Sequence, residues 1–241
     1  MLIHRVSEGE TIYSIAEAYG VSPESITLNN QLQNPESLVV GQTIVILYPK
    51  TVYTVEPGDT LESISIKTGI SITVLRRNNP VLNSGLYIYP GQTLVLEYQQ
   101  EKIGNLDVNG YVYTYISDSL LAQCLPYLTY ISIFSYGITS DGNLVYSDDE
   151  RIIRYANDFG VKPILVLTSL TEEGVFSSER VADLLSSYDA QENLIDNIVN
   201  LLKVKGYYGA DVDFEFIPSE FADVFAAFIG RLAAALNAEG M

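Results

Sequence analysis

Apolar runs alternate with stretches of helical periodicity from residue 104 to the end of the chain. The runs at residues 131–134 and 163–167 carry no charge, which is typical of strands buried on both faces. The alternation predicts an α/β domain built on a parallel sheet, with a small hairpin at Asp141-Gly142. The predicted strands span residues 111–115, 130–135, 162–168 and 208–215, and the predicted helices span residues 119–125, 149–157, 178–187, 191–204 and 219–237.

The fourth predicted strand carries three carboxylates at alternate positions. Because strand side chains alternate between faces, Asp211, Asp213 and Glu215 share one face, and the apolar residues between them share the other. Successive carboxylates then start about 6.5–7 Å apart. An inward acidic face combined with an apolar face on helices is typical of a barrel strand that bears a catalytic site. The flanking aromatic and aliphatic residues disfavour the alternative, a solvated edge strand.

This strand resembles the active-site strand of glycoside hydrolase family 18, whose motif is Asp-Gly-x-Asp-x-Asp-x-Glu. Gly209, Asp211, Asp213 and Glu215 match the motif, and Tyr208 replaces its first Asp. The resemblance implies that Glu215 is the general acid and that Asp213 orients the 2-acetamido group of the substrate, which attacks the anomeric carbon. It also implies that Asp211 hydrogen-bonds Asp213. This is the substrate-assisted, retaining variant of glycoside hydrolysis.

Aromatic residues lie at the carboxyl ends of the first two predicted strands. In a parallel barrel the reacting groups gather at that end, so Tyr113, Phe134 and Tyr136 are candidates for stacking on sugar rings. Ordinary packing in the core is the alternative for each, because aromatic residues are favoured in strands.

The second half of the chain is short for the fold that it resembles. A complete eightfold barrel takes about 250 residues, whereas residues 104–241 hold about four strand–helix units. The predicted fold class is therefore two small βααβ domains plus a truncated (β/α)8 barrel of the TIM type. An open barrel edge would expose unpaired backbone groups and make self-association plausible. We expect weak or no catalysis from such a chain alone.

The first hundred residues contain an internal duplication. Residues 6–12 align with residues 55–61, the pair Asn29-Asn30 with Asn78-Asn79, and Gly41-Gln42-Thr43 with residues 91–93. Each repeat predicts the order strand, helix, helix, strand. In the first repeat Thr11 is a plausible N-cap of a helix that ends at Gly20, and Pro23 fits the first turn of the next helix.

Both repeats resemble the LysM domain, over residues 2–48 and 51–98, and precede the family 18-like domain at 104–241. That family binds peptidoglycan or chitin through N-acetylglucosamine, and two linked sites would raise avidity. The resemblance implies two shallow grooves, each between the first strand–helix turn and the loop after the second helix. The first would use Gly9, Glu10, Thr11, Ile12, Asn30 and Leu32, and the second Gly58, Asp59, Thr60, Leu61, Asn79 and Pro80. The alternative for each of these residues is a structural role in a turn, as a helix cap or in the core.

The composition of the chain limits the classes of partner that it is expected to bind. A net charge of −17 disfavours nucleic acid and anionic membranes, whereas a neutral glycan is compatible with it. We find no stretch of about 18 apolar residues and no signal peptide, and therefore expect no membrane span. The single Cys124 is expected to be a buried thiol, and the single His4 part of the first strand. No metal site and no cofactor are expected.

The arrangement of two LysM repeats before a family 18-like domain resembles the spore cortex-lytic N-acetylglucosaminidases of spore-forming bacteria. Gly206-Tyr207-Tyr208-Gly209 and Asp213-Phe214-Glu215 match a motif of that group. The resemblance implies a glycosidase that acts in the spore coat, the cortex or the cell wall. A non-catalytic protein that binds peptidoglycan or chitin is the main alternative, and a structural component of the spore coat is a third.

Overall fold

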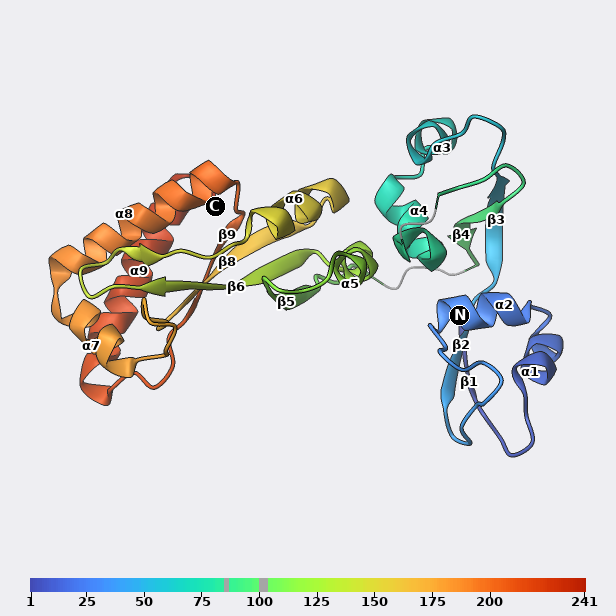
Figure 1. The fold of residues 1–241 in the computed structure, drawn as a ribbon, viewed down its shortest axis with the longest axis horizontal. Helices are drawn as coiled ribbons and strands as arrows, with labels where there is room; N and C mark the ends of the chain where they lie inside the picture. Colours follow the sequence, from blue (N-terminus) through green and yellow to red (C-terminus); the bar gives the residue numbers. More distant parts are fainter. Residues whose placement is uncertain (85–86, 100–103) are drawn as a thin grey trace. The chain divides into compact units, whose positions relative to one another are not determined.

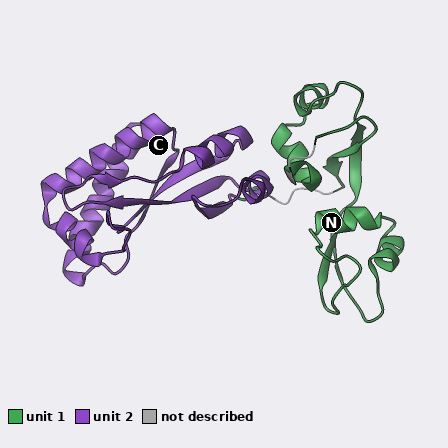
Figure 2. Ribbon diagram, viewed as in Figure 1, with its two compact units in different colours: residues 1–106 green, residues 107–241 purple. Residues whose placement is uncertain are grey.

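The computed structural model describes residues 1–84, 87–99 and 104–241. The chain divides into two compact units, residues 1–106 and residues 107–241 (Figure 2). The first unit contains two small hydrophobic cores and the second unit one larger core.

The first unit repeats the order strand, helix, helix, strand, as the sequence predicts (Figure 1). In each repeat the two strands pair antiparallel, and the second repeat adds a short 3-10 helix. The first repeat consists of β1 (Leu2–Arg5), α1 (Ile12–Tyr19), α2 (Pro23–Asn29) and β2 (Thr43–Ile46). The second consists of β3 (Pro49–Thr54), α3 (Leu61–Thr68), α4 (Ile72–Asn78), η1 (Pro80–Ser84) and β4 (Thr93–Tyr98).

The first helix of each repeat starts and stops at the same kinds of residue. Thr11 caps α1 by accepting from the backbone N–H of Ser14, whose side chain caps the Thr11 N–H in return, and Thr60 does the same with Ser63 in α3. This reciprocal capping box satisfies helix-end donors that would otherwise be unpaired. Gly20 ends α1 in the left-handed conformation, so both predicted ends of that helix are confirmed.

The second unit is an α/β domain. Its parallel strands lie in the order β5-β6-β8-β9, and β7 pairs antiparallel with the end of β6, which forms the predicted hairpin. The strands are β5 (Asn109–Tyr113), β6 (Tyr130–Ile138), β7 (Leu144–Val145), β8 (Lys162–Thr168) and β9 (Gly209–Asp213). The helices are α5 (Asp118–Cys124), η2 (Leu125–Tyr127), α6 (Glu150–Phe159), α7 (Ser178–Ser186), α8 (Tyr188–Lys205), η3 (Ser219–Phe221) and α9 (Ala222–Ala238).

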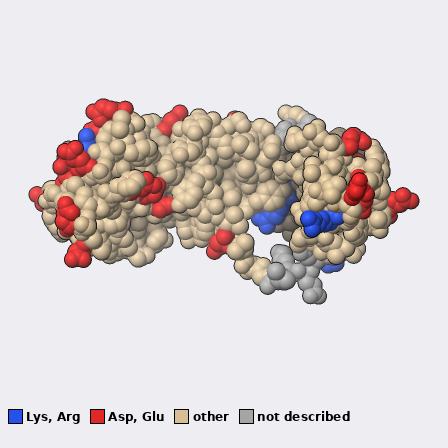
Figure 3. Space-filling view, turned by 90° about the horizontal axis from the view of Figure 1, so that it is seen from below, with Lys and Arg blue, Asp and Glu red and all other residues tan. Residues whose placement is uncertain are grey.

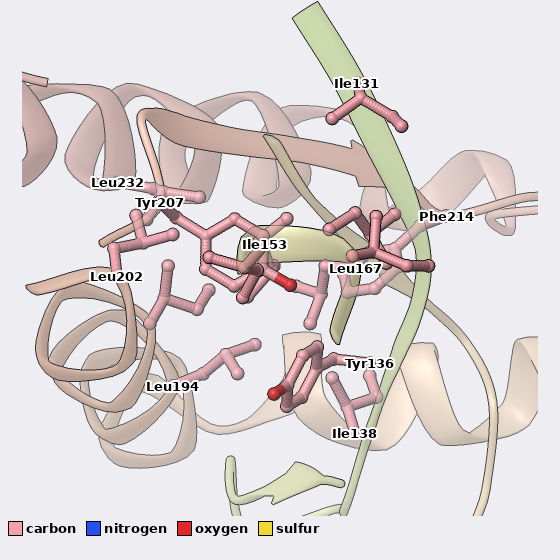
Figure 4. Packing of buried hydrophobic residues seen from close by; sticks show 14 of the residues in the cluster. Ile131, Tyr136, Ile138, Ile153, Leu167, Leu194, Leu202, Tyr207, Phe214 and Leu232 are labelled. Carbon is pink, nitrogen blue, oxygen red and sulfur yellow. The ribbon is translucent and has the colours of Figure 1, made fainter. Parts of the chain in front are cut away.

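The core of the second unit lies between the sheet and its helices. Figure 4 shows Leu167 of β8, Leu202 of α8 and Leu232 of α9 packed in this layer. Within the described residues β5 and β9 each pair with a strand on one side only, so both are edge strands. The carboxylates of β9 therefore lie along an edge of the sheet.

The β6–β7 hairpin is held against α8. Asn193 donates to the Asp141 carbonyl oxygen at 2.8 Å, and Asn197 donates to that of Gly142 at 3.0 Å. Gly142 has a φ of +86°, and a Cβ there would lie 2.1 Å from the Ala190 carbonyl oxygen. Glycine is required at this position for both its conformation and its size.

One expectation from composition is wrong. Cys124 is exposed, because the buried face of α5 carries Leu121 and the next buried residue is Leu125. The segment Ser219–Ala238 is long and apolar enough to cross a membrane by length and composition. In this fold α9 buries Phe228 and Leu232 in the core. Its Arg231 donates to Glu192 of α8 at 2.8 Å, so α9 packs as a domain helix.

Acidic side chains are spread over the surface. On the face shown in Figure 3, Asp and Glu appear on both units, whereas Lys and Arg form small groups. With a net charge of −17, this distribution repels polyanions.

Candidate active site

Strand β9 separates its acidic face from its apolar face as the alternation predicts. Ala210 and Val212 pack against the core, whereas Asp211 and Asp213 are half-buried on the other face. The strand ends at Asp213, shorter than predicted, so Glu215 lies in the following segment and is exposed. The next residue, Phe216, has a φ of +55°, a conformation that non-glycine residues rarely adopt.

Asp213 and Glu215 line one pocket together with two of the predicted aromatic residues, Tyr113 and Phe134. The pocket has a volume of about 510 Å³, which lies within the range typical of small-molecule sites. The Tyr113 and Phe134 ring centroids lie 5.3 Å apart, and Tyr115 stacks on Tyr113 at 5.3 Å. The remaining lining residues are Ser169, Phe176, Ser177, Ser178 and Phe216. The pocket therefore combines two carboxylates with aromatic faces.

Tyr111 is a residue of this site that sequence reasoning missed. Its hydroxyl donates to the Asp211 carboxylate at 2.7 Å, and its ring lies 5.8 Å from Phe134. The hydrogen bond to Asp211, followed by partial desolvation, raises the pKa of Tyr111 above its ordinary value of 10.0. Among the described residues, Asp211 bonds Tyr111 rather than Asp213. Since Tyr111 and Tyr113 share a strand face, the alternation that selected Tyr113 could have found Tyr111 too.

Tyr136 lies elsewhere, which corrects its prediction as a sugar-stacking residue. It is 2% exposed, and its hydroxyl donates to Asp149 at 2.8 Å on the helix-covered side of the sheet (Figure 4). Simple alternation would place Tyr136 on the same side as Phe134. The pairing of β6 with β8 shifts register between Ile133 and Tyr136, and this irregularity breaks the alternation.

The bond from Tyr136 belongs to a buried network centred on Asp149. Tyr207 donates to the same carboxylate at 2.5 Å, and Lys205 pairs with it at 2.6 Å. Burial raises the pKa of both Tyr136 and Tyr207, and the hydrogen bonds to Asp149 add to it. Asp149 is completely buried, and these three partners satisfy its carboxylate oxygens. The network joins β6, α6 and α8 behind the sheet.

The predicted glycan-binding residues of the first unit are largely engaged within the protein. Asn30 donates from Nδ2 to the carbonyl oxygens of Ile26 and Val45, and its Oδ1 accepts from the Val45 N–H. Asn79 makes the same three bonds with Leu75 and Val95. Each side chain thus fastens the second helix of its repeat to the closing strand. Both amides are thus bonded within the protein, which fits the structural alternative, and their contact with sugar stays a prediction.

The predicted turn residues also have structural roles. Gly9 and Gly58 have φ values of +82° and +87°, which the turn requires. Thr11 and Thr60 are caps, and the side chains of Ile12, Leu32 and Leu61 pack in or against the small cores. Pro80 begins η1.

The acidic turn residues are bonded to their own repeats. Glu10 contacts His4 of β1 at 2.9 Å, and Asp59 contacts Lys67 at 2.7 Å and Tyr53 at 2.7 Å. The hydrogen bond from Lys67, with those from the Glu56 N–H and Tyr53, holds the pKa of Asp59 well below its usual value.

Comparison with known proteins identifies the first unit. Residues 4–47 and 53–97 match the LysM domain, so the chain carries two LysM domains. They occupy the two strand–helix–helix–strand repeats described above.

The whole chain is homologous to sporulation and cortex-lytic proteins of bacilli. It is 32% identical over 241 residues to YdhD of Bacillus subtilis (strain 168), whose name describes a sporulation-specific glycosylase. It is 29% identical over 228 residues to the cortical fragment-lytic enzyme of Bacillus anthracis, which covers 93% of this chain and 53% of that protein. The crystal structure of the spore cortex-lytic enzyme SleL of Bacillus megaterium QM B1551 matches 98% of the chain with a TM-score of 0.72 at 29% identity.

A chitinase from Chromobacterium violaceum matches 56% of the chain with a TM-score of 0.52 at 21% identity, which supports the α/β fold alone. The chain spans about half the length of its curated relatives, 56% of YdhD and 53% of the Bacillus anthracis enzyme. The same share, 56%, holds for the SleL crystal structure.

Proposed function

We propose that this protein is a glycoside hydrolase that cleaves β-1,4 bonds after N-acetylglucosamine in bacterial cell-wall glycan, in the spore cortex or coat or in the cell wall. The observation that carries the proposal is the pocket shared by Asp213, Glu215, Tyr113 and Phe134. Relatives named as a glycosylase and as cortex-lytic enzymes support it.

In this mechanism Glu215 protonates the leaving glycosidic oxygen, and its exposure in the pocket makes it accessible to substrate. Asp213 orients the 2-acetamido group, whose carbonyl oxygen attacks the anomeric carbon and breaks the glycosidic bond. Water then opens the cyclic intermediate, with Glu215 acting as the base, and the configuration is retained. Tyr111 holds Asp211 by a 2.7 Å hydrogen bond and thereby helps to position the carboxylate beside Asp213.

The LysM domains would hold the enzyme on its polymeric substrate. We take peptidoglycan as the polymer, because relatives are named as cortical fragment-lytic enzymes and the chain carries two LysM domains. Two weak sites on one chain raise the effective concentration of the catalytic unit at the glycan without any new contact.

Mass spectrometry of fragments released from purified peptidoglycan tests the proposal. The sequence alone predicts weak or no catalysis, but the pocket lined by Asp213 and Glu215 leads us to expect that the chain releases fragments that end in reducing N-acetylglucosamine. NMR of the first product should show a retained anomeric configuration. A Glu215→Gln variant should release at least a hundredfold less, whereas Glu220→Gln, which alters an exposed residue of η3, should match the unaltered chain. Products that end in the other sugar of the repeat would contradict the proposed bond specificity.

A non-catalytic glycan-binding protein is the second candidate. It is favoured by the position of β9 as an edge strand within the described residues, because the carboxylates then lack a neighbouring strand on one side. Under this alternative the chain sediments with peptidoglycan and releases no fragment.

A further inference from the structure

A groove lies within the first unit where the two LysM domains meet. Helix α2 of the first domain forms one side, and the segment from the end of α4 through β4 of the second domain forms the other. Its volume of about 420 Å³ falls within the range of small-ligand sites. None of the turn residues at 9–12 or 58–61 lines it, so it differs from the single-domain grooves implied by the LysM resemblance, with which it shares Asn79 and Pro80.

Hydrogen bonds join the two sides of this groove. The Tyr98 hydroxyl lies 3.2 Å from Oδ1 of Asn29 in the first domain and 3.0 Å from the Asn78 carbonyl oxygen in the second. The Gln99 N–H also donates to the Tyr48 carbonyl oxygen at 2.7 Å. These contacts connect α2, α4 and the last strand, so the groove is organised before a ligand arrives. Such preorganisation reduces the entropic cost of binding.

The lining is chemically suited to a neutral sugar polymer. The lining combines hydroxyl and amide groups with the apolar surfaces of Leu28, which is 37% exposed, and Tyr89, which is 63% exposed. Among the described lining residues Glu24 alone is charged, and its sign disfavours acidic peptides and other anions. An N-acetylated sugar presents the complementary groups: apolar ring faces, hydroxyls and an amide.

Two amides in the lining are oriented by bonds on their oxygen atoms. The Gln92 Oε1 accepts from the Tyr89 N–H at 3.1 Å, and the Asn29 Oδ1 accepts from Tyr98. Within residues 1–84, 87–99 and 104–241 neither amide nitrogen donates to a protein group. Each nitrogen is therefore available to a sugar hydroxyl or carbonyl oxygen.

We propose that this groove binds one strand of an N-acetylglucosamine-containing glycan through contacts from both LysM domains at once. The inference rests on the proposed function for the class of ligand and adds the place where the ligand is bound. The two domains then act as a single composite site rather than as two independent ones.

Calorimetric titration of the full chain with the soluble hexamer of N-acetylglucosamine tests this inference. Leu28→Ala and Tyr89→Ala alter opposite sides of the groove, and each should weaken binding about tenfold, as expected for a central contact residue. Tyr87→Ala and Val40→Ala are the matched controls, because both residues are exposed, at 92% and 64%, and neither lines the groove. Their affinities should equal that of the unaltered chain.

The outcomes separate this inference from the proposed function. Weakening by Tyr89→Ala alone would overturn the composite site, because the second domain would then bind by itself. Hexamer binding unchanged in both groove variants would also overturn it, while sedimentation of all variants with peptidoglycan would leave the proposed function standing. An unaltered chain that neither binds the hexamer nor sediments with peptidoglycan would contradict both. Thermal unfolding of each variant checks that the domains remain folded.

Discussion

At the scale of single residues, the second Asn of each Asn-Asn pair has a structural role that its position in the sequence did not reveal. Asn30 and Asn79 satisfy the N–H and C=O of one residue in the closing strand, and the identical bond lengths in both repeats indicate a common device. A buried amide that pairs with backbone groups is costly to remove, because those groups are then unsatisfied.

Asn79→Ala should therefore destabilise the second LysM domain by about 3 kcal/mol, since it leaves backbone groups of Leu75 and Val95 without their partner. Hydrogen exchange followed by NMR would show early loss of protection at the Val95 amide. Asn34→Ala alters an exposed Asn of the first domain and should change nothing. Unchanged protection of Val95 in Asn79→Ala would refute the structural role.

Tyr111 is a positioning residue of the candidate site, since it contacts Asp211 and lies beside the pocket aromatics. Tyr111→Phe should lower kcat on peptidoglycan about tenfold and leave KM unchanged, because it removes a hydrogen bond to a charged group without removing the ring. Because its pKa is raised above 10.0, the hydroxyl is protonated between pH 5 and pH 9, so the effect should not vary over that range.

The control for this change is Tyr115→Phe, which alters an exposed tyrosine that stacks on Tyr113. Equal effects of the two substitutions on kcat, or an effect of Tyr111→Phe on KM alone, would argue against a positioning role for the Tyr111 hydroxyl.

At the scale of secondary structure elements, Asp59 connects β3, the following turn and α3 of the second LysM domain. Its lowered pKa means that the ionised form is favoured in the folded state. The Asp59 carboxylate therefore stabilises the fold at pH values above 3.8, the ordinary pKa of the group. That contribution is lost as the pH falls below 3.8 through the lowered pKa.

Asp59→Asn should accordingly lower the melting temperature of the second LysM domain at pH 7, and the difference from the unaltered chain should shrink as the pH falls below 3.8. Scanning calorimetry between pH 2 and pH 7 measures both effects. Glu17→Gln alters an exposed residue of α1 and serves as the control. A difference that is constant over this pH range would exclude the carboxylate charge as its origin.

The hairpin and α8 meet so closely at Gly142 that a side chain cannot be accommodated. Gly142→Ala should destabilise the second unit by about 2 kcal/mol or more, because the new Cβ would meet the Ala190 carbonyl oxygen in a backbone conformation that alanine avoids. Gly174 also has a positive φ, +76°, but open space surrounds it. The Gly174→Ala variant therefore measures only the free-energy cost of the backbone conformation. Chemical denaturation of the two variants should show the larger loss for Gly142→Ala.

At the scale of the whole molecule, the sequence predicted the order and type of most elements because its periodic patterns are strong. The alternating carboxylates identified β9, and the repeated cap and turn residues identified both LysM domains. The sequence predicts the position of a side chain less well where tertiary contacts determine that position. The register shift in β6 placed Tyr136 behind the sheet. Alternation could place Tyr111 on the same face as Tyr113, but its hydrogen bond to Asp211 joins β5 to β9, two strands that the order β5-β6-β8-β9 separates.

The same limit applies to the glycan-binding residues. The repeat alignment found Asn79 and Pro80, but the groove between the LysM domains also depends on Leu28 and Tyr89, which lie 61 positions apart by their residue numbers. Their proximity follows from how the two domains pack, which no local pattern encodes.

The central claim is that Glu215 supplies the acid catalysis of a glycosidase. The most direct test is the initial rate of reducing-end release from purified peptidoglycan by the chain and by its Glu215→Gln variant, at equal concentration. Loss of a general acid lowers rates by about 10²–10⁴-fold, so the variant should fall at least a hundredfold below the unaltered chain while it sediments equally with the glycan. Equal rates for the two proteins, or no release by either, would contradict the claim.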